Sequence, residues 1–412
     1  MNSLDSQPAL HGVALRLLAA APHRLLFFVG AANVLLAMGW WTLWLIDARW
    51  QVVGMPQPAV FAGWMHAIIM QYQVLPSFMF GFLLTVFPRW MSLPPLARRH
   101  YVPVGIGMLG GQALTLAGLL AHPRLLQAGI ALTLLGWSIG LFWLLRLLGR
   151  ETGCTWHAMS CAGAIALGWM GLSLLAIYSH TLDPGLAFVA IKIGSFGLLL
   201  PIFFTVCHRM VPFFAGSVIP GYVAARPMWA LAAFWVLAFT HLLLELAHGY
   251  AWLWLPDLPL AVLTGGLLSR WWPRNAPMPA LLRVLFVGFA WLPVAMLLYA
   301  GQSLWFAVTS EFVLGRAPAH ALFVGFFGSL LVAMVTRVTQ GHSGRPLQLG
   351  RVAGFAFVAV QIVAVTRIAA DLAPDALLWQ AVAAVGWMLA FTPWVLRSCW
   401  IFLTPRIDRR PG

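Results

Sequence analysis

The residues that could do chemistry in this chain are the few ionisable side chains that fall within or at the ends of its long apolar runs. They are Lys192, Glu245, His66, His241, His248 and His320. Ionisable groups inside a membrane span are costly, so they usually mark a functional site. Imidazole nitrogens bind haem iron, copper and zinc, and histidines on separate helices therefore predict a haem or metal site.

The segment from 241 to 248 holds three of these groups. His241, Glu245 and His248 are spaced at i, i+4 and i+7, which predicts one shared helix face and a metal site on it. The alternative is hydrogen bonding between helices. A carboxylate at this depth needs a partner, and Lys192 or one of the other histidines could supply it.

His66 and His320 each lie near the start of an apolar run, and both runs cross from outside to inside. Their similar depth predicts two axial ligands for one haem held between helices. The alternative is that each is a hydrogen-bonded histidine at a helix end. The chain has no Cys-x-x-Cys-His motif, so covalent attachment of haem is not expected.

The composition is that of a protein whose solvent is lipid. Hydrophobic residues make up 62% of the chain and charged residues 8%, and the mean hydropathy is +0.88. A soluble domain has about a quarter charged residues. The apolar runs lie near 25–46, 64–87, 103–121, 125–148, 157–179, 186–206, 228–247, 251–272, 281–300, 318–339, 352–371 and 376–403. We expect an all-α, polytopic membrane protein with about 12 transmembrane helices, since one span needs roughly 20 apolar residues.

The net charge of +14 is best explained by the positive-inside rule, and we expect no nucleic-acid partner. Most arginines fall in alternate gaps, while the other gaps hold Arg49, Arg124, Arg316 and Arg367. Both termini are therefore predicted to be cytoplasmic. We expect a cytoplasmic segment at 1–24, one transmembrane domain at 25–403 and a cytoplasmic tail at 404–412.

Specific strings resemble the NnrS family of bacterial inner-membrane proteins. Residues 21–30 (APHRLLFFVG) resemble the start of that family, and residues 81–90 (GFLLTVFPRW) resemble its G-F-L-L-T-x-x-P-x-W motif. Residues 209–214 (RMVPFF) are similar to its R-x-x-P-x-F motif. The region from His320 to Leu347 is similar nearly throughout. The second span departs from the family, because Ile68 and Ile69 stand where H-A-H-E-M has its second histidine and its glutamate.

The resemblance implies a role in nitric oxide stress or denitrification, with haem (heme) and copper as cofactors and a small diatomic ligand such as nitric oxide. Residue by residue, it implies that His23, His66, His320 and His342 are cofactor histidines. Arginines are suited to haem propionates because they are planar cationic donors. The candidates are Arg24, Arg209, Arg337 and Arg345, for which the alternative role is membrane orientation.

Two other functions remain open. The chain could be a transporter or channel without a cofactor, in which Lys192, Glu245 and His241 form a polar relay. It could also be a membrane partner that stabilises a denitrification enzyme. There is no phosphate-binding glycine loop and no Walker-type lysine, so pumping driven by ATP is not expected. The sequence does not decide whether the protein is an enzyme, or its oligomeric state.

Overall fold

The computed structural model describes residues 16–274 and 276–408. Within this part of the chain the fold is all-helical, with 12 helical segments that are long and apolar enough to cross a membrane. The predicted fold class is therefore confirmed. Residues 1–15 of the predicted N-terminal segment and residues 409–412 of the predicted tail lie outside the described residues.

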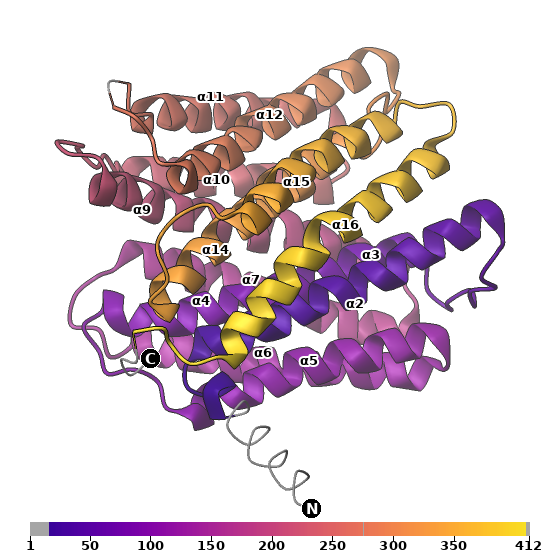
Figure 1. Cartoon of the computed structure of the whole chain (residues 1–412). Coiled ribbons are helices and arrows are strands. Elements are labelled where there is room, and N and C mark those ends of the chain that lie inside the picture. Colours follow the sequence, from indigo (N-terminus) through magenta and orange to yellow (C-terminus); the bar gives the residue numbers. More distant parts are fainter. Residues whose placement is uncertain (1–15, 275, 409–412) are drawn as a thin grey trace, which may run out of the picture.

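The first six spans are α2 (Pro22–Trp50), α3 (Ala62–Ile69) with η1 (Met70–Val74) and α4 (Leu75–Trp90), α5 (Arg98–Leu120), α6 (Pro123–Leu148), α7 (Trp156–Thr181), and α8 (Pro184–Lys192) with η2 (Ile193–Leu199) and α9 (Leu200–Val218). The next six are α10 (Met228–Leu246), η3 (Tyr250–Trp252) with α11 (Trp254–Trp271), α12 (Ala280–Thr309), α13 (Ala317–His320) with η4 (Ala321–Gly328) and α14 (Ser329–Ser343), α15 (Arg351–Ala370), and α16 (Ala376–Leu403). The long helices run roughly side by side (Figure 1).

Three spans form the centre of the bundle. They are the second, sixth and tenth, in which 83%, 67% and 72% of the most apolar stretch is buried, against 33–61% in the other spans. The outer helices pack against their neighbours in chain order, and α16 packs against α2. This last contact brings the final span back to the first (Figure 1).

The same three inner spans share an unusual build. Each contains a π-helical segment: η1 in the second span, η2 in the sixth and η4 in the tenth. The segments η1 and η2 are in contact. π-Helical turns are rare and are often found at functional sites, because they displace side chains from the regular helical register.

Glycines set the spacing of α5 and α6. A Cβ atom on Gly107 would lie 2.6 Å from Cα of Gly136, and one on Gly118 would lie 2.1 Å from the backbone nitrogen of Leu126. Small residues allow such close approach of helices in lipid, where packing replaces the hydrophobic effect as the driving force. Gly107 and Gly136 are therefore packing residues.

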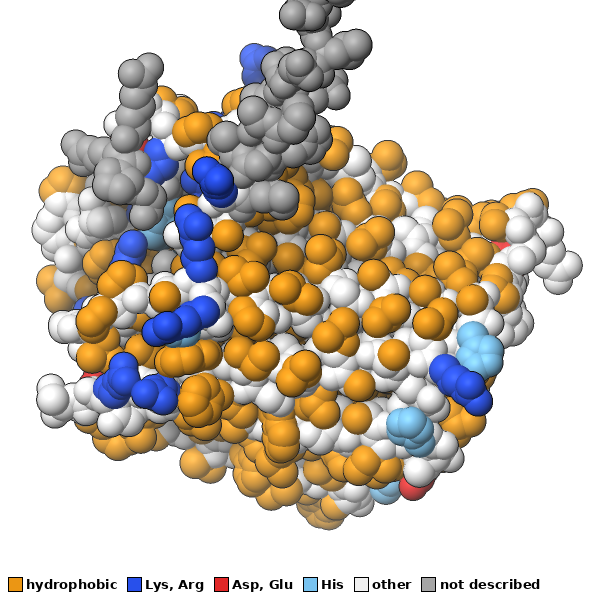
Figure 2. Space-filling view, turned by 90° about the horizontal axis from the view of Figure 1, so that it is seen from below, with side chains coloured by type: hydrophobic (Ala, Val, Ile, Leu, Met, Phe, Trp, Pro, Cys, Tyr) orange, Lys and Arg blue, Asp and Glu red, His pale blue; other side chains and the backbone are white. Residues whose placement is uncertain are grey.

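The two ends of the described chain lie at the same end of the bundle. The Arg24 guanidinium at the start of α2 donates to the backbone oxygen of Phe402 at the end of α16, at 2.7 Å from Nη2, and also to that of Thr404. One face of the protein is apolar across its middle, with most of its visible Lys and Arg side chains at one end (Figure 2). This distribution is typical of a membrane protein with a positive inner side.

Candidate functional site

A cavity of about 500 Å³ is lined by the three inner spans together with α2, α15 and α16, at the level of the π-helical segments. Each π segment contributes to its wall, with Gln71 from η1, Phe196 from η2 and Phe323 from η4 among the lining residues. Sites for small molecules and cofactors usually measure about 300–1,000 Å³. The volume therefore suits a cofactor.

His66 and His320 both line this cavity, which we call the histidine cavity. His66 lies on α3 and His320 is the last residue of α13, so the two side chains come from different spans. Both are half-buried, which is consistent with rings that face an internal space. The structure thus brings together the two histidines for which the sequence predicted a common site.

The ring of His320 is held in one tautomer. Its Nδ1 lies 2.9 Å from the backbone oxygen of Arg316, and a carbonyl oxygen can only accept, so Nδ1 carries the proton. The other nitrogen, Nε2, then keeps its lone pair. Histidines that ligate metals are commonly oriented in this way by a backbone carbonyl.

The ring of His66 is oriented by aromatic stacking. It lies parallel to the indole of Trp41, with ring centroids 4.5 Å apart and an interplanar angle of 9°. Trp41 stacks in turn on Trp44 at 5.1 Å. Among the described residues, no hydrogen bond to either ring nitrogen of His66 is found. The unprotonated nitrogen of its ring is therefore available to bind a metal.

Cations and unpartnered polar atoms also lie in the wall of the histidine cavity. Arg316, Arg367 and Lys192 line it. The Arg367 guanidinium is 2.9 Å from the Asp371 carboxylate. Three lining side chains carry a buried polar atom that has no partner in the described part of the chain, namely Nε1 of Trp44, Nε1 of Trp387 and Oε1 of Gln71. A buried polar group without a partner calls for an explanation, and a bound polar ligand is one.

The four arginines proposed for haem propionates lie elsewhere and do not line the histidine cavity. Arg24 donates to backbone oxygens at the end of α16. Arg209 lies over the ring of Trp90 at 4.3 Å, Arg337 over Phe214 at 4.0 Å, and Arg345 over Trp400 at 5.3 Å. The structure therefore associates these four arginines with packing at the helix ends.

His23 and His342 form a pair at the arginine-rich end of the bundle. Their ring centroids are 4.1 Å apart with an interplanar angle of 34°, and Nδ1 of His23 is buried without a partner in the described chain. Two imidazoles on opposite faces of one iron would have their nitrogens about 4 Å apart and their ring centres farther still, because a metal–nitrogen bond is about 2 Å. In this arrangement they leave no room for a porphyrin between them.

The predicted partner of Glu245 is found. Nζ of Lys192 lies 2.7 Å from Oε1 of Glu245. Nε2 of His241 is 3.8 Å from Oε2 of the same carboxylate, and Nδ1 of His241 donates to Oδ1 of Asp257 at 2.6 Å. The result is a largely buried series of four ionisable groups in which basic and acidic side chains alternate, which is how ionisable groups are tolerated in an apolar interior.

The expectation that His241, Glu245 and His248 share one helix face is wrong. Helix α10 ends at Leu246, and His248 has a positive φ of 56°, which turns the chain out of the helix. Nδ1 of His248 lies 2.9 Å from the Tyr250 hydroxyl instead. In residues 16–274 and 276–408, no group of three or more His, Cys, Asp or Glu side chains is placed to hold a metal ion.

Three residues of the site were missed by sequence reasoning. Asp257 lies within the eighth apolar run and carried no prediction, yet it is the buried partner of His241. Arg316 and Arg367 were read as topology markers. Their position on the predicted outer side, where arginines are scarce, was the available signal, and Arg316 also lies four residues before His320.

Comparison with known proteins decides the family. The model of the family described as NnrS protein matches residues 17–406, nearly the whole chain. The chain belongs to the NnrS family. No curated protein and no solved structure matches it.

The departure of this NnrS protein from the H-A-H-E-M string now has a structural description. Ile68 and Ile69 are 3% and 1% exposed and form part of the apolar core. They do not line the histidine cavity, whereas His66, Ala67 and Met70 do. In this chain, positions 68 and 69 therefore contribute no side chain to the wall of the histidine cavity.

Proposed function

We propose that this NnrS protein binds haem in the histidine cavity, in the inner membrane of a bacterium, and acts there in the response to nitric oxide or in denitrification. The observation that carries the proposal is the convergence of His66 and His320 on one cavity from two different spans. The family membership adds the expectation of haem that the resemblance implied.

The residues present fit a haem group. His66 and His320 would be its ligands, and Nε2 of His320 has the free lone pair that a metal needs. Arg316, Arg367 and Lys192 are cations in the same wall, suited to the two carboxylates of a haem. The unpartnered indole N–H groups of Trp44 and Trp387 can donate hydrogen bonds to a polar group of the haem.

Haem iron, when bound, would supply electron transfer, or binding of a diatomic ligand at the position that one of the two histidines vacates. The protein supplies the rest. The Arg316 carbonyl and the Trp41 ring fix the directions of the two imidazoles. Aromatic side chains line part of the wall, and the ion pair with Glu245 holds the Lys192 ammonium group beside the cavity. Such orientation and polarity tune a haem.

For copper, no group of three or more His, Cys, Asp or Glu side chains is placed to hold the ion in the described part of the chain. Protein copper sites draw on several convergent histidine, cysteine or methionine ligands. The paired rings of His23 and His342 supply two, and the described chain brings no third His, Cys, Asp or Glu to them. We therefore derive no step that uses copper.

The test is an absorption spectrum of the purified, detergent-solubilised chain after incubation with haem. We expect a Soret band with about one haem per chain, and at least a tenfold loss of bound haem in His320→Ala and in His66→Ala, because each removes one metal bond. The control is His180→Ala, which changes an exposed histidine at the end of α7. A colourless wild-type chain, or a full Soret band in both cavity variants, overturns the proposal.

The contact between Lys192 and Glu245 also supports the second candidate, a transporter without a cofactor. Lys192 belongs both to the cavity wall and to the series of ionisable groups, and it contacts Glu245, whose second carboxylate oxygen lies 3.8 Å from Nε2 of His241. This function predicts colourless protein and ion flux into liposomes that Glu245→Gln abolishes. Flux that is unchanged by Glu245→Gln excludes it.

A further inference from the structure

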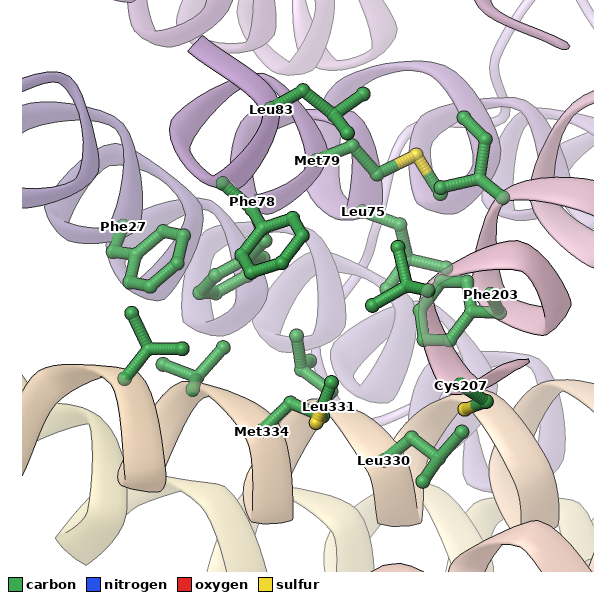
Figure 3. Close-up of a pocket in the computed structure, with 15 residues that line it drawn as sticks. Phe27, Leu75, Phe78, Met79, Leu83, Phe203, Cys207, Leu330, Leu331 and Met334 are labelled. Carbon is green, nitrogen blue, oxygen red and sulfur yellow. The ribbon is translucent and has the colours of Figure 1, made fainter. Parts of the chain in front are cut away.

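A second, smaller cavity lies among the three inner spans. It measures about 70 Å³ and is lined from α4, α9 and α14, with Phe27 of α2 beside them. Figure 3 shows Phe78, Met79 and Leu83 on one side of it, Leu330, Leu331 and Met334 on another, and Phe203 and Cys207 on a third. Nearly every lining side chain is a hydrocarbon or a thioether.

This apolar cavity is unsuited to water. A water molecule needs two to four polar partners, and the wall offers only the Cys207 thiol, a weak hydrogen-bonding group. The volume of about 70 Å³ exceeds the roughly 10–15 Å³ that one water requires, so space is not the limit. A cavity with an apolar wall can bind small uncharged molecules such as xenon.

The apolar cavity adjoins the histidine cavity. Leu75 of α4 and Leu331 of α14 line both. At its other end, Phe27 and Val338 each lie four residues, about one helical turn, from His23 and His342. The apolar cavity therefore lies between the two histidine pairs, and two leucine side chains form its boundary with the histidine cavity.

We propose that the apolar cavity is a docking chamber for a small uncharged diatomic gas, one step before the histidine cavity. This proposal rests on the proposed function, because the gas would pass from the apolar cavity to a haem in the adjoining histidine cavity. The chemistry of the wall selects the ligand: charged or strongly polar molecules would lose their hydration there without compensation, whereas an apolar gas loses almost nothing. Such a gas also dissolves in the hydrocarbon that surrounds the bundle.

The experiment uses xenon as the probe, because xenon matches the size and polarity of the proposed ligand and can be located in crystals of the full chain under xenon pressure. We expect a xenon atom among Phe78, Met79 and Leu330. Two filling variants act from different helices, Val206→Phe on α9 and Val338→Phe on α14. Each should lower xenon occupancy by about fivefold or more, since a phenyl ring occupies the space.

Val236→Phe is the matched control. It makes the same exchange on α10 at a side chain that is 65% exposed, so xenon binding should be unchanged. Xenon absent from the wild-type cavity, or retained in both filling variants, overturns the docking chamber. Because xenon needs no iron, this result is separate from the Soret test.

Discussion

Nζ of Lys192 lies 2.7 Å from Oε1 of Glu245, and this ion pair joins the wall of the histidine cavity to a second buried pair, His241 and Asp257. The side chains of His241 and Asp257 are fully buried, and that of Glu245 is 5% exposed. In this series, each ionisable side chain is stabilised by its neighbour. Removing one member should therefore cost more than removing a matched pair.

Glu245→Leu should destabilise the protein by about 3–5 kcal/mol, because it leaves an ammonium group in the bundle without its carboxylate. The double variant Lys192→Met/Glu245→Leu should recover most of that loss. Thermal unfolding in detergent measures both. Arg49→Gln, which breaks the exposed pair with Asp375, is the control and should have little effect. A single variant as stable as the wild type would show that this pair is not a structural requirement.

Gly107→Ala should destabilise the protein by about 1–3 kcal/mol, because its Cβ would lie 2.6 Å from the backbone of Gly136 and the two helices would have to separate. Gly163→Ala is the matched control on α7, where a Cβ meets no atom within 4 Å. Alanine favours helix over glycine, so that variant should be neutral or slightly more stable. Equal unfolding temperatures for the two variants would contradict the close approach of α5 and α6.

Arg316→Gln should weaken haem binding by about tenfold or more, the effect of losing one charge-assisted hydrogen bond. Arg337→Gln, at the opposite end of its span, should leave haem affinity unchanged, since Arg337 packs on Phe214 away from the histidine cavity. Titration of the purified chain with haem gives both affinities. If Arg337→Gln weakens haem binding and Arg316→Gln does not, the arginines that the family resemblance implied are favoured as the haem contacts.

Asp375 should give α16 a stability that depends on pH. Its carboxylate accepts from the backbone N–H of Leu378 and from Arg49, and these bonds, Leu378 first, lower the pKa of Asp375 below its ordinary value. A lowered pKa means that the stabilisation is complete above the ordinary value of 3.8 and is lost as pH falls through the lowered value. The difference in unfolding temperature between wild type and Asp375→Ala should be present at pH 6 and should shrink below pH 3. A difference that stays constant with pH would exclude the carboxylate charge as its source.

The number and order of the spans could be predicted from sequence because hydropathy and length decide them directly. The eighth span contains a proline and an aspartate, which hydropathy alone counts against a membrane helix. Pro256 lies in the first turn of α11, where a missing backbone N–H costs little, and Asp257 is compensated by His241 from the preceding span. A partner on another helix leaves no trace in a hydropathy window.

The site was predictable in part. The shared depth of His66 and His320 followed from topology, since both begin spans of the same direction. The prediction that His248 shares a helix face with His241 and Glu245 failed because periodicity cannot show where a helix ends. Helix α10 ends two residues before His248. The π-helical segments shift the register around Gln71 and Phe196, so no helical wheel would have placed these side chains in the histidine cavity.

The most direct measurement is a density map of the haem-loaded chain in lipid nanodiscs. Our account predicts a porphyrin in the histidine cavity, where His66 and His320 would hold its iron and Arg316 and Arg367 would be the cations available to its carboxylates. A porphyrin at the His23 and His342 end, or a histidine cavity filled only by water or lipid in protein that has been incubated with haem, would contradict it.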